Sequence, residues 1–448
     1  MTQIAMNFLR FTESQNHYEK WRGQLPNGWR IEKLKYIAFL QLSNVDKHTV
    51  EGQESVQLCN YTDVYNNEKI TSAIPFMHAT ATVEQIKRLS LQKSDVLLTK
   101  DSETPDDIGV PAVVLEELMG VVCGYHLAIA RPKPDVVIGE FLFRAIQSEP
   151  VKKYFFSRAV GMTRYGLDKQ ALAETPIALP DLAKQRAIAD YLDRQTAKLD
   201  ALIATKERLL HLLAEKRRAL ITHAVTRGLN PDAPMRDSGI EWLGEIPAHW
   251  GVVRLRRVLA SMDYGISKSV GPEGKIAVLR MGDISDGEII FDNVGFVDEV
   301  DSGLLLNPGD LLFNRTNSLA LVGKVGLFRD EFKFPTSFAS YLVRLQCNET
   351  VLPEYLNYIL NSSPILTWAR SEALPAIGQA NLNPNRYSYL LISLPPIEEQ
   401  HLIVKHLNSS TQHIDNLRTA IEQTIELLHE RRTALIAAAV SGQVRVGA

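Results

Sequence analysis

The sequence contains little cysteine. Cys59, Cys123 and Cys347 are the only three in 448 residues, and they lie far apart without any CxxC spacing. An odd number of cysteines at such distances suggests neither a disulfide framework nor a thiolate zinc site. We therefore predict that they are core or incidental residues and that the chain holds no metal.

Long hydrophobic runs are also missing. No segment approaches the roughly 20 apolar residues that span a bilayer. Residues 1–10 lack the basic start, apolar centre and cleavage site of a signal peptide. The sequence predicts a cytoplasmic protein that has no membrane partner.

The chain has no excess of positive charge, because 49 Lys and Arg residues face 52 Asp and Glu residues, for a net charge of -3. Any binding to nucleic acid must then come from locally clustered cations. The length, with 45% hydrophobic and 23% charged residues, is typical of a folded protein with two or more domains.

Catalytic motifs are absent as well. The Asn/Asp-Pro-Pro-aromatic loop of amino methyltransferases is missing, and Asn383-Pro384-Asn385-Arg386 is the nearest approach. There is no phosphate loop, HExxH helix or GxSxG turn. Asp263 with Glu273-Gly274-Lys275 imitates a nuclease spacing, but the segment between them has a loop-like composition. We predict a non-catalytic protein.

The chain does contain an internal repeat. Four residues recur at a constant offset of 221: Trp21, Gly23, Pro26 and Trp29 correspond to Trp242, Gly244, Pro247 and Trp250. LPDLAKQRAIADYL from Leu179 matches LPPIEEQHLIVKHL from Leu394 at an offset of 215, and this register holds for about 47 residues. Residues 30–178 and 251–393 share only scattered phrases. The pattern indicates a duplicated scaffold with divergent middle segments.

The second part of each repeat predicts a long helix. Strong helix formers run from Asp181 to about Arg227, after Pro180 and before Gly228. Apolar residues at heptad spacing predict a coiled-coil seam. The seam residues are Leu192, Leu199, Leu202, Leu209, Leu213 and Leu220 in the first helix, and Leu407, Ile414, Leu417, Ile421, Leu428 and Leu435 in the second. The seams can bury each other as an antiparallel spacer, or each can pack on its own globular half.

The middle segments predict mixed α/β domains in which strands dominate. The fold class is therefore α+β: two such domains joined by two long helices packed as an antiparallel coiled coil, with pseudo-twofold duplication. The predicted segments are a first domain at 1–180, a first helix at 181–228, an extended connector at 229–249, a second domain at 250–395 and a second helix at 396–448.

Reading DNA requires cations for phosphates and planar amide or guanidinium groups for base edges. Such groups occur at corresponding places in the two halves, at the end of a strand-like run and in a glycine-containing loop before the long helix. Arg164 suits guanine or a phosphate, whereas Gln379 and Asn381 suit adenine. The predicted DNA-binding residues are Thr99, Lys100, Thr163, Arg164, Tyr165, Lys169, Arg280, Asn314, Arg315, Thr316, Gln379 and Asn381.

GLNPDAPMRDSGIEWLGEIPAHW at 228–250 closely resembles the central connector of the specificity subunits of type I restriction-modification systems. LPDLAKQ and LPPIEEQ are similar to the conserved regions that open the long helices of that family. The loops GMTRYG and IGQAN depart from the Gly-Ser-Thr phrase that members often carry. The resemblance implies two target-recognition domains, each reading one half of a bipartite double-stranded DNA site.

The same resemblance implies partner subunits. Two modification subunits, which bind S-adenosylmethionine and methylate adenine, would dock on the long helices. Restriction subunits, which use ATP and magnesium, would join through the methyltransferase complex, and this chain would hold no cofactor. Half-site centres are expected about one turn of DNA apart, roughly 34 Å.

Two rival interpretations belong to other classes. A protein-interaction scaffold would use the same helical spacer without direct base readout. A methyltransferase fused to its own recognition domains is disfavoured by the missing base-flipping motif.

Overall fold

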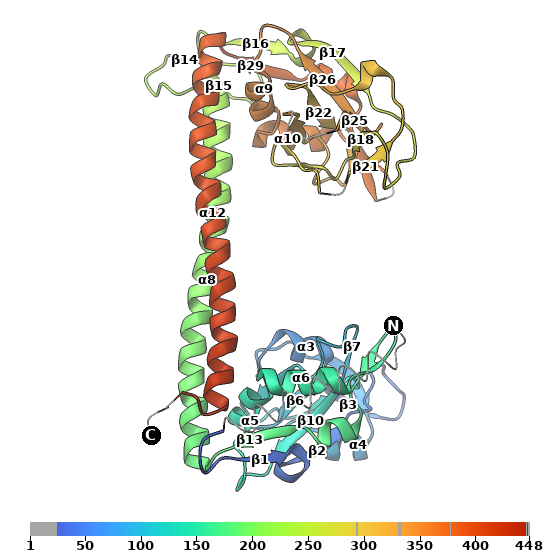
Figure 1. Ribbon diagram of the computed structural model, residues 1–448, viewed down its shortest axis with the longest axis vertical. Helices are drawn as coiled ribbons and strands as arrows, with labels where there is room; N and C mark the ends of the chain where they lie inside the picture. Colours follow the sequence, from blue (N-terminus) through green and yellow to red (C-terminus); the bar gives the residue numbers. More distant parts are fainter. Residues whose placement is uncertain (1–24, 293, 330–333, 377, 445, 447–448) are drawn as a thin grey trace. The chain divides into compact units, whose positions relative to one another are not determined.

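The computed structural model describes residues 25–292, 294–329, 334–376, 378–444 and 446 (Figure 1). Trp21 and Gly23 of the repeat lie outside the described residues. Within the described part, no helix is long and apolar enough to cross a membrane. The chain forms two compact units. The first unit runs to Lys206 and includes residues from Gln423 onward, and the second unit is Glu207–Glu422.

The first domain is built around a five-stranded sheet in the order β2-β10-β6-β8-β4. Its strands are β2 (Ala38–Leu42), β10 (Leu127–Pro132), β6 (Val96–Thr99), β8 (Pro111–Val114) and β4 (Lys69–Ile70). Successive side chains of a strand point to opposite faces. Leu98 thus packs in the core beneath helix α5 (Gly139–Ile146), whereas Leu97 packs toward a second sheet, β5-β3-β9. The sheet is therefore buried on both faces.

The second domain has a similar plan. A six-stranded sheet runs β17-β26-β22-β24-β20-β19, and a three-stranded sheet runs β21-β18-β25. Their bounds are β17 (Leu259–Tyr264), β26 (Leu342–Cys347), β22 (Leu311–Asn314), β24 (Val325–Leu327), β20 (Glu288–Ile289), β19 (Ile284–Ser285), β21 (Gly295–Val297), β18 (Ile276–Leu279) and β25 (Thr336–Phe338). The predicted strand-rich α/β domains are confirmed.

Shorter elements complete the two domains. In the first they are β1 (Arg30–Lys33), α2 (Leu34–Ile37), β3 (Glu54–Cys59), α3 (Tyr61–Asn66), β5 (Met77–Ala81), α4 (Val83–Leu89), β9 (Val121–Cys123), α6 (Glu149–Arg158), α7 (Lys169–Ala173) and β13 (Pro176–Leu179). In the second they are β16 (Gly251–Arg254), η1 (Leu255–Arg257), η2 (Ser302–Leu304), α9 (Pro353–Leu360), α10 (Ser363–Glu372), α11 (Pro384–Ser388) and β29 (Leu391–Leu394). Pairing of β1 with β13, and of β16 with β29, closes each domain beside its long helix.

The two predicted long helices are present as α8 (Leu182–Arg227) and α12 (Ile397–Val440). In the first unit, Leu192 of α8 and Ile436 of α12 belong to one core that also contains residues of α5. In the second unit, Ile221 of α8 and Leu407 of α12 share a core with α9. Within each unit the helices therefore pack on each other and also on the domain, so both predicted arrangements occur together.

The helix seam differs from the prediction at three positions. Leu192, Leu407, Ile414 and Leu428 are buried, and Leu199 and Leu213 are half-buried. Leu202, Leu209 and Leu417, however, are 42%, 39% and 41% exposed. Seam residues of a heptad alternate between steps of three and four residues. The step after Leu199 is four residues long, so it passes Leu202 and reaches Ile203, which is buried.

Matched residues of the repeat form crosswise ion pairs between the helices. In the first unit, Arg432 Nε lies 2.8 Å from Asp200 Oδ1. In the second unit, Arg217 Nε lies 3.4 Å from Asp415 Oδ1. Asp200 corresponds to Asp415 and Arg217 to Arg432 at the offset of 215. Each unit thus contains the same antiparallel contact with the roles of the two helices exchanged.

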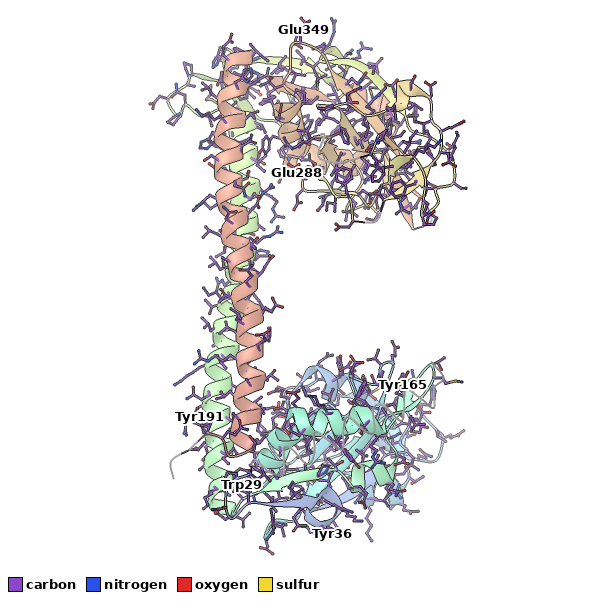
Figure 2. All side chains as sticks on the ribbon, in the orientation of Figure 1. Trp29, Tyr36, Tyr165, Tyr191, Glu288 and Glu349 are labelled. Atoms are coloured by element: carbon purple, nitrogen blue, oxygen red, sulfur yellow. The ribbon has the colours of Figure 1, made fainter. Side chains whose placement is uncertain are left out.

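The ends of the long helices are also equivalent. Gly228 after α8 and Gly442 after α12 have φ values of 75° and 74°, which favour glycine. A Cβ built on Gly228 would contact Trp250, and one built on Gly442 would contact Trp29, which is labelled in Figure 2. The connector after α8 contains a short hairpin, β14 (Met235–Asp237) with β15 (Glu245–Pro247). This connector is therefore internally paired.

Candidate nucleic-acid interface

Each domain carries a small three-stranded sheet that joins two segments far apart in sequence. In the first domain, β7 (Asp101–Ser102) pairs with β12 (Tyr165–Gly166), which pairs with β11 (Val160–Gly161). In the second, β23 (Thr316–Asn317) pairs with β28 (Gln379–Asn381), which pairs with β27 (Leu374–Ala376). We call these the first and second edge sheets. They bring each predicted strand end next to its predicted loop.

Backbone hydrogen bonds show that the two edge sheets are equivalent. Lys100 N donates to His126 O at 2.9 Å, and Leu167 N donates to Lys100 O at 2.8 Å. In the second domain, Arg315 N donates to Tyr341 O at 3.2 Å, and Leu382 N donates to Arg315 O at 2.8 Å. All three pairs of matched residues are 215 positions apart. The divergent middle segments therefore conserve this local backbone plan.

The first edge sheet carries a chain of charged groups. Asp101 Oδ2 lies 3.1 Å from Lys100 Nζ and 2.8 Å from His126 Nδ1. Arg164 lies 3.4 Å from the His126 ring, and Lys100 Nζ stands 4.6 Å from the ring centroid of Tyr125. Lys100 is consequently held by its neighbours and half-buried, whereas Arg164 is exposed.

The remaining loop residues of this sheet differ in exposure. Thr163 is exposed beside Arg164, and Tyr165, labelled in Figure 2, is half-buried within β12. The exposed guanidinium and hydroxyl are thus carried by the turn of a paired hairpin. This support limits the positions that the two groups can adopt.

The second edge sheet presents amide and guanidinium groups. Asn381 Nδ2 donates to Thr316 Oγ1 at 2.9 Å, and Arg315 lies 3.5 Å from Asn381 Oδ1. The Arg315 guanidinium also stands 5.2 Å from the ring centroid of Tyr264. Gln379 is exposed. One open hollow is lined by Arg315, Thr316, Ser340, Tyr341, Gln379, Ala380 and Asn381.

Three predicted DNA contacts are internal residues. Thr99, Asn314 and Thr316 are 0%, 1% and 6% exposed. Thr99 Oγ1 accepts a hydrogen bond from Val110 N at 3.0 Å, and Asn314 Nδ2 donates to Met281 O at 2.9 Å. Thr99 and Asn314 thus bond to backbone groups of adjacent loops, and Thr316 Oγ1 accepts from the Asn381 side chain. Contact of these three residues with DNA stays a prediction.

Two further predicted residues lie outside the edge sheets. Lys169 is exposed at the first position of α7, after the N-cap residue Asp168. Arg280 is exposed just beyond β18, where its backbone N donates to Asp283 Oδ2 at 2.6 Å. Their contact with DNA stays a prediction.

Sequence reasoning missed the residues that hold the cations in place. Asp101 and His126 position Arg164, and the ring of Tyr264 lies beside Arg315. The repeat offset of 215 contained part of this signal, because it matches Lys100 with Arg315 and His126 with Tyr341. Asp101 directly follows Lys100, whereas His126 and Tyr264 come from segments far from Arg164 and Arg315 in the sequence.

The described residues contain no group of three or more His, Cys, Asp or Glu side chains placed to hold a metal ion. The three cysteines are unbridged. Burial raises the pKa of Cys347 to about 12, so its thiol stays protonated. Asp263, from the nuclease-like spacing, lies 2.7 Å from Arg344. Burial alone would raise the pKa of Asp263, but Arg344 lowers it overall.

Comparisons with known proteins agree on one family. A family model for the type I restriction modification DNA specificity domain matches residues 53–211. The specificity subunit of the type I restriction enzyme EcoKI from Escherichia coli K12 is 22% identical, with 94% of this chain and 90% of that protein covered. The StySPI specificity subunit from Salmonella potsdam is 20% identical over the same shares. The MjaVIII specificity subunit from Methanocaldococcus jannaschii is 21% identical, with 98% of each chain covered.

Solved structures support the fold. A chain from a study of complex assembly and conformational transition of the type I R-M system matches with a TM-score of 0.71 at 18% identity, covering 94% of this chain and 99% of that one. The HsdS subunit from Thermoanaerobacter tengcongensis matches with a TM-score of 0.53 at 19% identity, covering 94% and 98%. Residues 53–211 match the type I restriction modification DNA specificity domain, and the chain is similar over nearly its whole length to the specificity subunits of type I restriction enzymes.

Proposed function

We propose that this chain reads a bipartite double-stranded DNA target, one half-site through each edge sheet, and presents that DNA to modification subunits. The observation that carries the proposal is the equivalence of the two edge sheets at one repeat offset. Each sheet holds a guanidinium group at a strand end or hairpin turn, with further hydrogen-bonding side chains beside it. An interrupted target has two half-sites, and two equivalent recognition surfaces can bind one half-site each.

The two edge sheets suit different bases. Arg164 and Thr163 on the first hairpin match guanine acceptors or phosphates. Gln379 and Asn381 on the second present amides, which pair with the N6 and N7 edge of adenine, and Arg315 lies beside them. The two half-sites are therefore expected to differ in sequence, which makes the whole target asymmetric.

The most direct test is methylome sequencing of cells that express this chain with its cognate modification subunit, compared with cells that lack the chain. We expect a new interrupted motif with methyladenine on both strands. Absence of new methylation, with a modification subunit proven active alongside another specificity subunit, would reject DNA readout.

Exchange of the middle segments separates the two readers. Replacing residues 30–178 by the corresponding segment of a relative should change one half of the motif, and replacing 251–393 should change only the other. Each exchange is the control for the other, because the half of the motif that it should leave unchanged is the half that the other should alter. A change in both halves after either exchange would contradict modular reading.

The rival protein-interaction scaffold predicts a different salt response. A protein that neutralises many phosphates loses roughly a thousandfold in affinity between about 50 and 200 mM salt. We expect this steep dependence for the assembled complex on target DNA. Weak binding that salt does not alter would favour the scaffold.

Exposed leucines on the long helices mark the expected docking surfaces for modification subunits. Leu202 and Leu427 belong to the first unit, and Leu212 and Leu417 to the second. They are 42%, 63%, 50% and 41% exposed, respectively. None of them contributes to the cores that join helices to domains. Leu202 matches Leu417, and Leu212 matches Leu427, at the offset of 215.

The helix register places these leucines together in pairs. In the first unit, the contact of Asp200 with Arg432 brings Leu427 near position 205, about one turn from Leu202. In the second, the contact of Arg217 with Asp415 brings Leu417 near position 215, about one turn from Leu212. Two equivalent apolar patches support two bound modification subunits.

Substitution by lysine tests the two docking surfaces. We expect Leu427→Lys, and separately Leu212→Lys, to leave complexes with one modification subunit, as measured by native mass spectrometry. Leu402→Lys is the control, because Leu402 is 60% exposed and has no leucine at its matched position. Two retained subunits in both variants would show that other surfaces bind the partners.

A further inference from the structure

Each edge sheet exposes one large aliphatic side chain on its outer strand. Val160 in β11 is 73% exposed, and Leu374 in β27 is 69% exposed. They occupy equivalent strands, because β11 pairs only with β12 and β27 only with β28 among the described strands. Neither side chain belongs to a hydrophobic core cluster. Folding therefore does not explain an aliphatic residue at these positions.

The strand register places these side chains in a row with polar groups. In the second edge sheet, Leu374 is paired with Asn381, and Asn381 with Thr316. In the first, Val160 is paired with Gly166, and Gly166 with Asp101. Directly paired residues lie on the same face, with Cβ atoms about 4.5–5.5 Å apart. Leu374 is thus the immediate neighbour of the Asn381 amide.

Asn381 retains the hydrogen-bonding capacity that adenine requires. Its amide nitrogen carries two hydrogens, and one is donated to Thr316 Oγ1 at 2.9 Å. Its amide oxygen has two acceptor sites, and Arg315 lies 3.5 Å from it. One donor and one acceptor remain, which is the set that bidentate pairing with adenine N7 and N6 uses.

An aliphatic side chain beside such an amide matches the major groove of an A·T-containing step. Thymine presents a C5-methyl group there, and apolar side chains contact it. We propose that Leu374 contacts a thymine methyl group in the second half-site, next to the adenine edge bound by Asn381, and that Val160 makes the equivalent methyl contact in the first half-site. This inference rests on the proposed function.

Deoxyuridine provides the test, because it removes the methyl group and keeps the base-pairing edge. The complex of this chain with its modification subunits is assembled, and its binding is measured on target duplexes in which each thymine is replaced in turn. Loss of one buried methyl group should weaken wild-type binding about fourfold at one second-half thymine. Leu374→Ala should bind the thymine and deoxyuridine duplexes equally.

Val160→Ala serves as the reciprocal control. It should abolish the thymine preference in the first half-site and leave the second unchanged, while Leu374→Ala does the opposite. Both side chains are exposed, so their truncation leaves no cavity in the domains. Methylation of the unmodified target by each variant checks that the complexes have assembled.

Three results would overturn the inference. These are a second half-site that contains no thymine, wild-type binding that is insensitive to every deoxyuridine replacement there, and a Leu374→Ala complex that keeps the wild-type preference. Methylation of an interrupted motif by the wild-type complex would still support the proposed function in all three cases. Failure of the wild-type complex to methylate any motif is the separate outcome that rejects the proposed function.

Discussion

The junction between domain and helix pair is built around a buried arginine in the first unit, which we call the charged junction, and around a tyrosine hydroxyl in the second, which we call the tyrosine junction. In the first, Arg144 of α5 is 1% exposed and lies 2.8 Å from Asp193 of α8. In the second, Tyr358 of α9 donates from its hydroxyl to Asn408 of α12 at 2.7 Å. Asp193 and Asn408 are matched by the repeat. The two halves thus use the same helix position with different chemistry.

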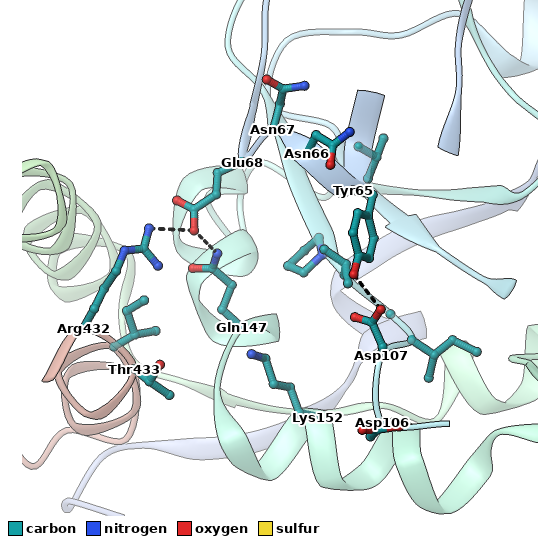
Figure 3. A pocket seen from close by; sticks show the side chains of 16 residues that line it. Tyr65, Asn66, Asn67, Glu68, Asp106, Asp107, Gln147, Lys152, Arg432 and Thr433 are labelled. Carbon is teal, nitrogen blue, oxygen red and sulfur yellow. Dashed lines mark hydrogen bonds and ion pairs between the residues drawn. The ribbon is translucent and has the colours of Figure 1, made fainter. Parts of the chain in front are cut away.

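Glu68 is the centre of the charged junction, at the edge of a hollow between the first domain and α12 (Figure 3). Its carboxylate lies 3.1 Å from Arg144 and 2.7 Å from both Arg432 and Gln147. Burial alone would raise the pKa of Glu68, but the two guanidinium groups outweigh it and lower the pKa. The corresponding hollow of the second unit is lined by basic, acidic and amide side chains, among them Arg217, Asp415 and Asn408.

The difference separates two faces of each helix. Seam positions such as Leu192 and Leu407 stay apolar in both copies, because each lies in a hydrophobic core with residues of the opposite helix of its own unit. The domain-facing position has changed together with the divergent middle segment, as Asp193 and Asn408 show. The duplicated helices therefore conserve their mutual packing while each adapts to its own domain.

The largest expected effect is removal of the buried cation from the charged junction. Arg144→Ala leaves Glu68 and Asp193 with fewer compensating charges, and the two carboxylates are partly exposed. Breaking a buried ion pair costs about 3 kcal/mol at the lower end of the usual range. We expect this lower value because the two carboxylates are partly exposed. Hydrogen exchange resolved by segment should show lower protection in the first domain and unchanged protection in the second. Equal loss in both units would contradict separate junctions.

Acidification should weaken the charged junction selectively. Burial alone would raise the pKa values of Glu68 and Asp193 from 4.5 and 3.8, but neighbouring cations lower both: Arg144 with Arg432 for Glu68, and Arg144 with Lys69 for Asp193. Carboxyl groups with lowered folded-state pKa values stabilise the fold above their ordinary pKa and lose this contribution as the pH falls through the folded-state value. Limited proteolysis between about pH 6 and pH 3 should release the first domain before the second. A Glu68→Gln variant should lose part of this pH dependence.

A smaller effect is expected at the tyrosine junction. Tyr358→Phe removes one hydrogen bond to Asn408 and keeps the ring in place. The cost is about 1 kcal/mol, because a single hydrogen bond makes that net contribution. Urea denaturation monitored by exchange in α9 measures it. A loss as large as that for Arg144→Ala would remove the contrast between the junctions.

The smallest expected effect concerns the crosswise ion pairs, which both units share. Asp200→Ala and Asp415→Ala each break one partly exposed contact with an arginine of the opposite helix. Each should cost only about 0.5 kcal/mol, because exposed ion pairs contribute little. Thermal unfolding of the two variants should agree closely. A clear difference would show that the scaffold itself, and not only its junctions, has diverged.

Much of the architecture was predictable from the sequence. The repeat indicated two equivalent halves, and helix formers between Pro180 and Gly228 predicted α8 to within one residue of its observed bounds, Leu182–Arg227. Periodicity also predicted most of the buried seam. It misplaced Leu202, Leu209 and Leu417, because apolar character alone does not distinguish a seam position from the exposed position beside it.

The candidate site was predictable only in part. The repeat placed Lys100 with Arg315 and each with its loop, and the edge sheets bring these segments together. Residue type could not show that Thr99, Asn314 and Thr316 are buried, the first two bonded to backbone groups and the third to the Asn381 side chain. Polar side chains at strand ends serve either purpose, and the neighbouring loop decides which.

The sequence by itself determined the duplication, the two long helices, the strand-rich character of the domains and the family resemblance. These are properties of spacing and composition, which act locally or repeat along the chain. Only the tertiary structure decided which side chains of the edge sheets face outward, which charges meet at each junction and where Leu374 stands relative to Asn381. Those relations depend on strand register and on the packing of helices against domains, and no local pattern in the sequence encodes either.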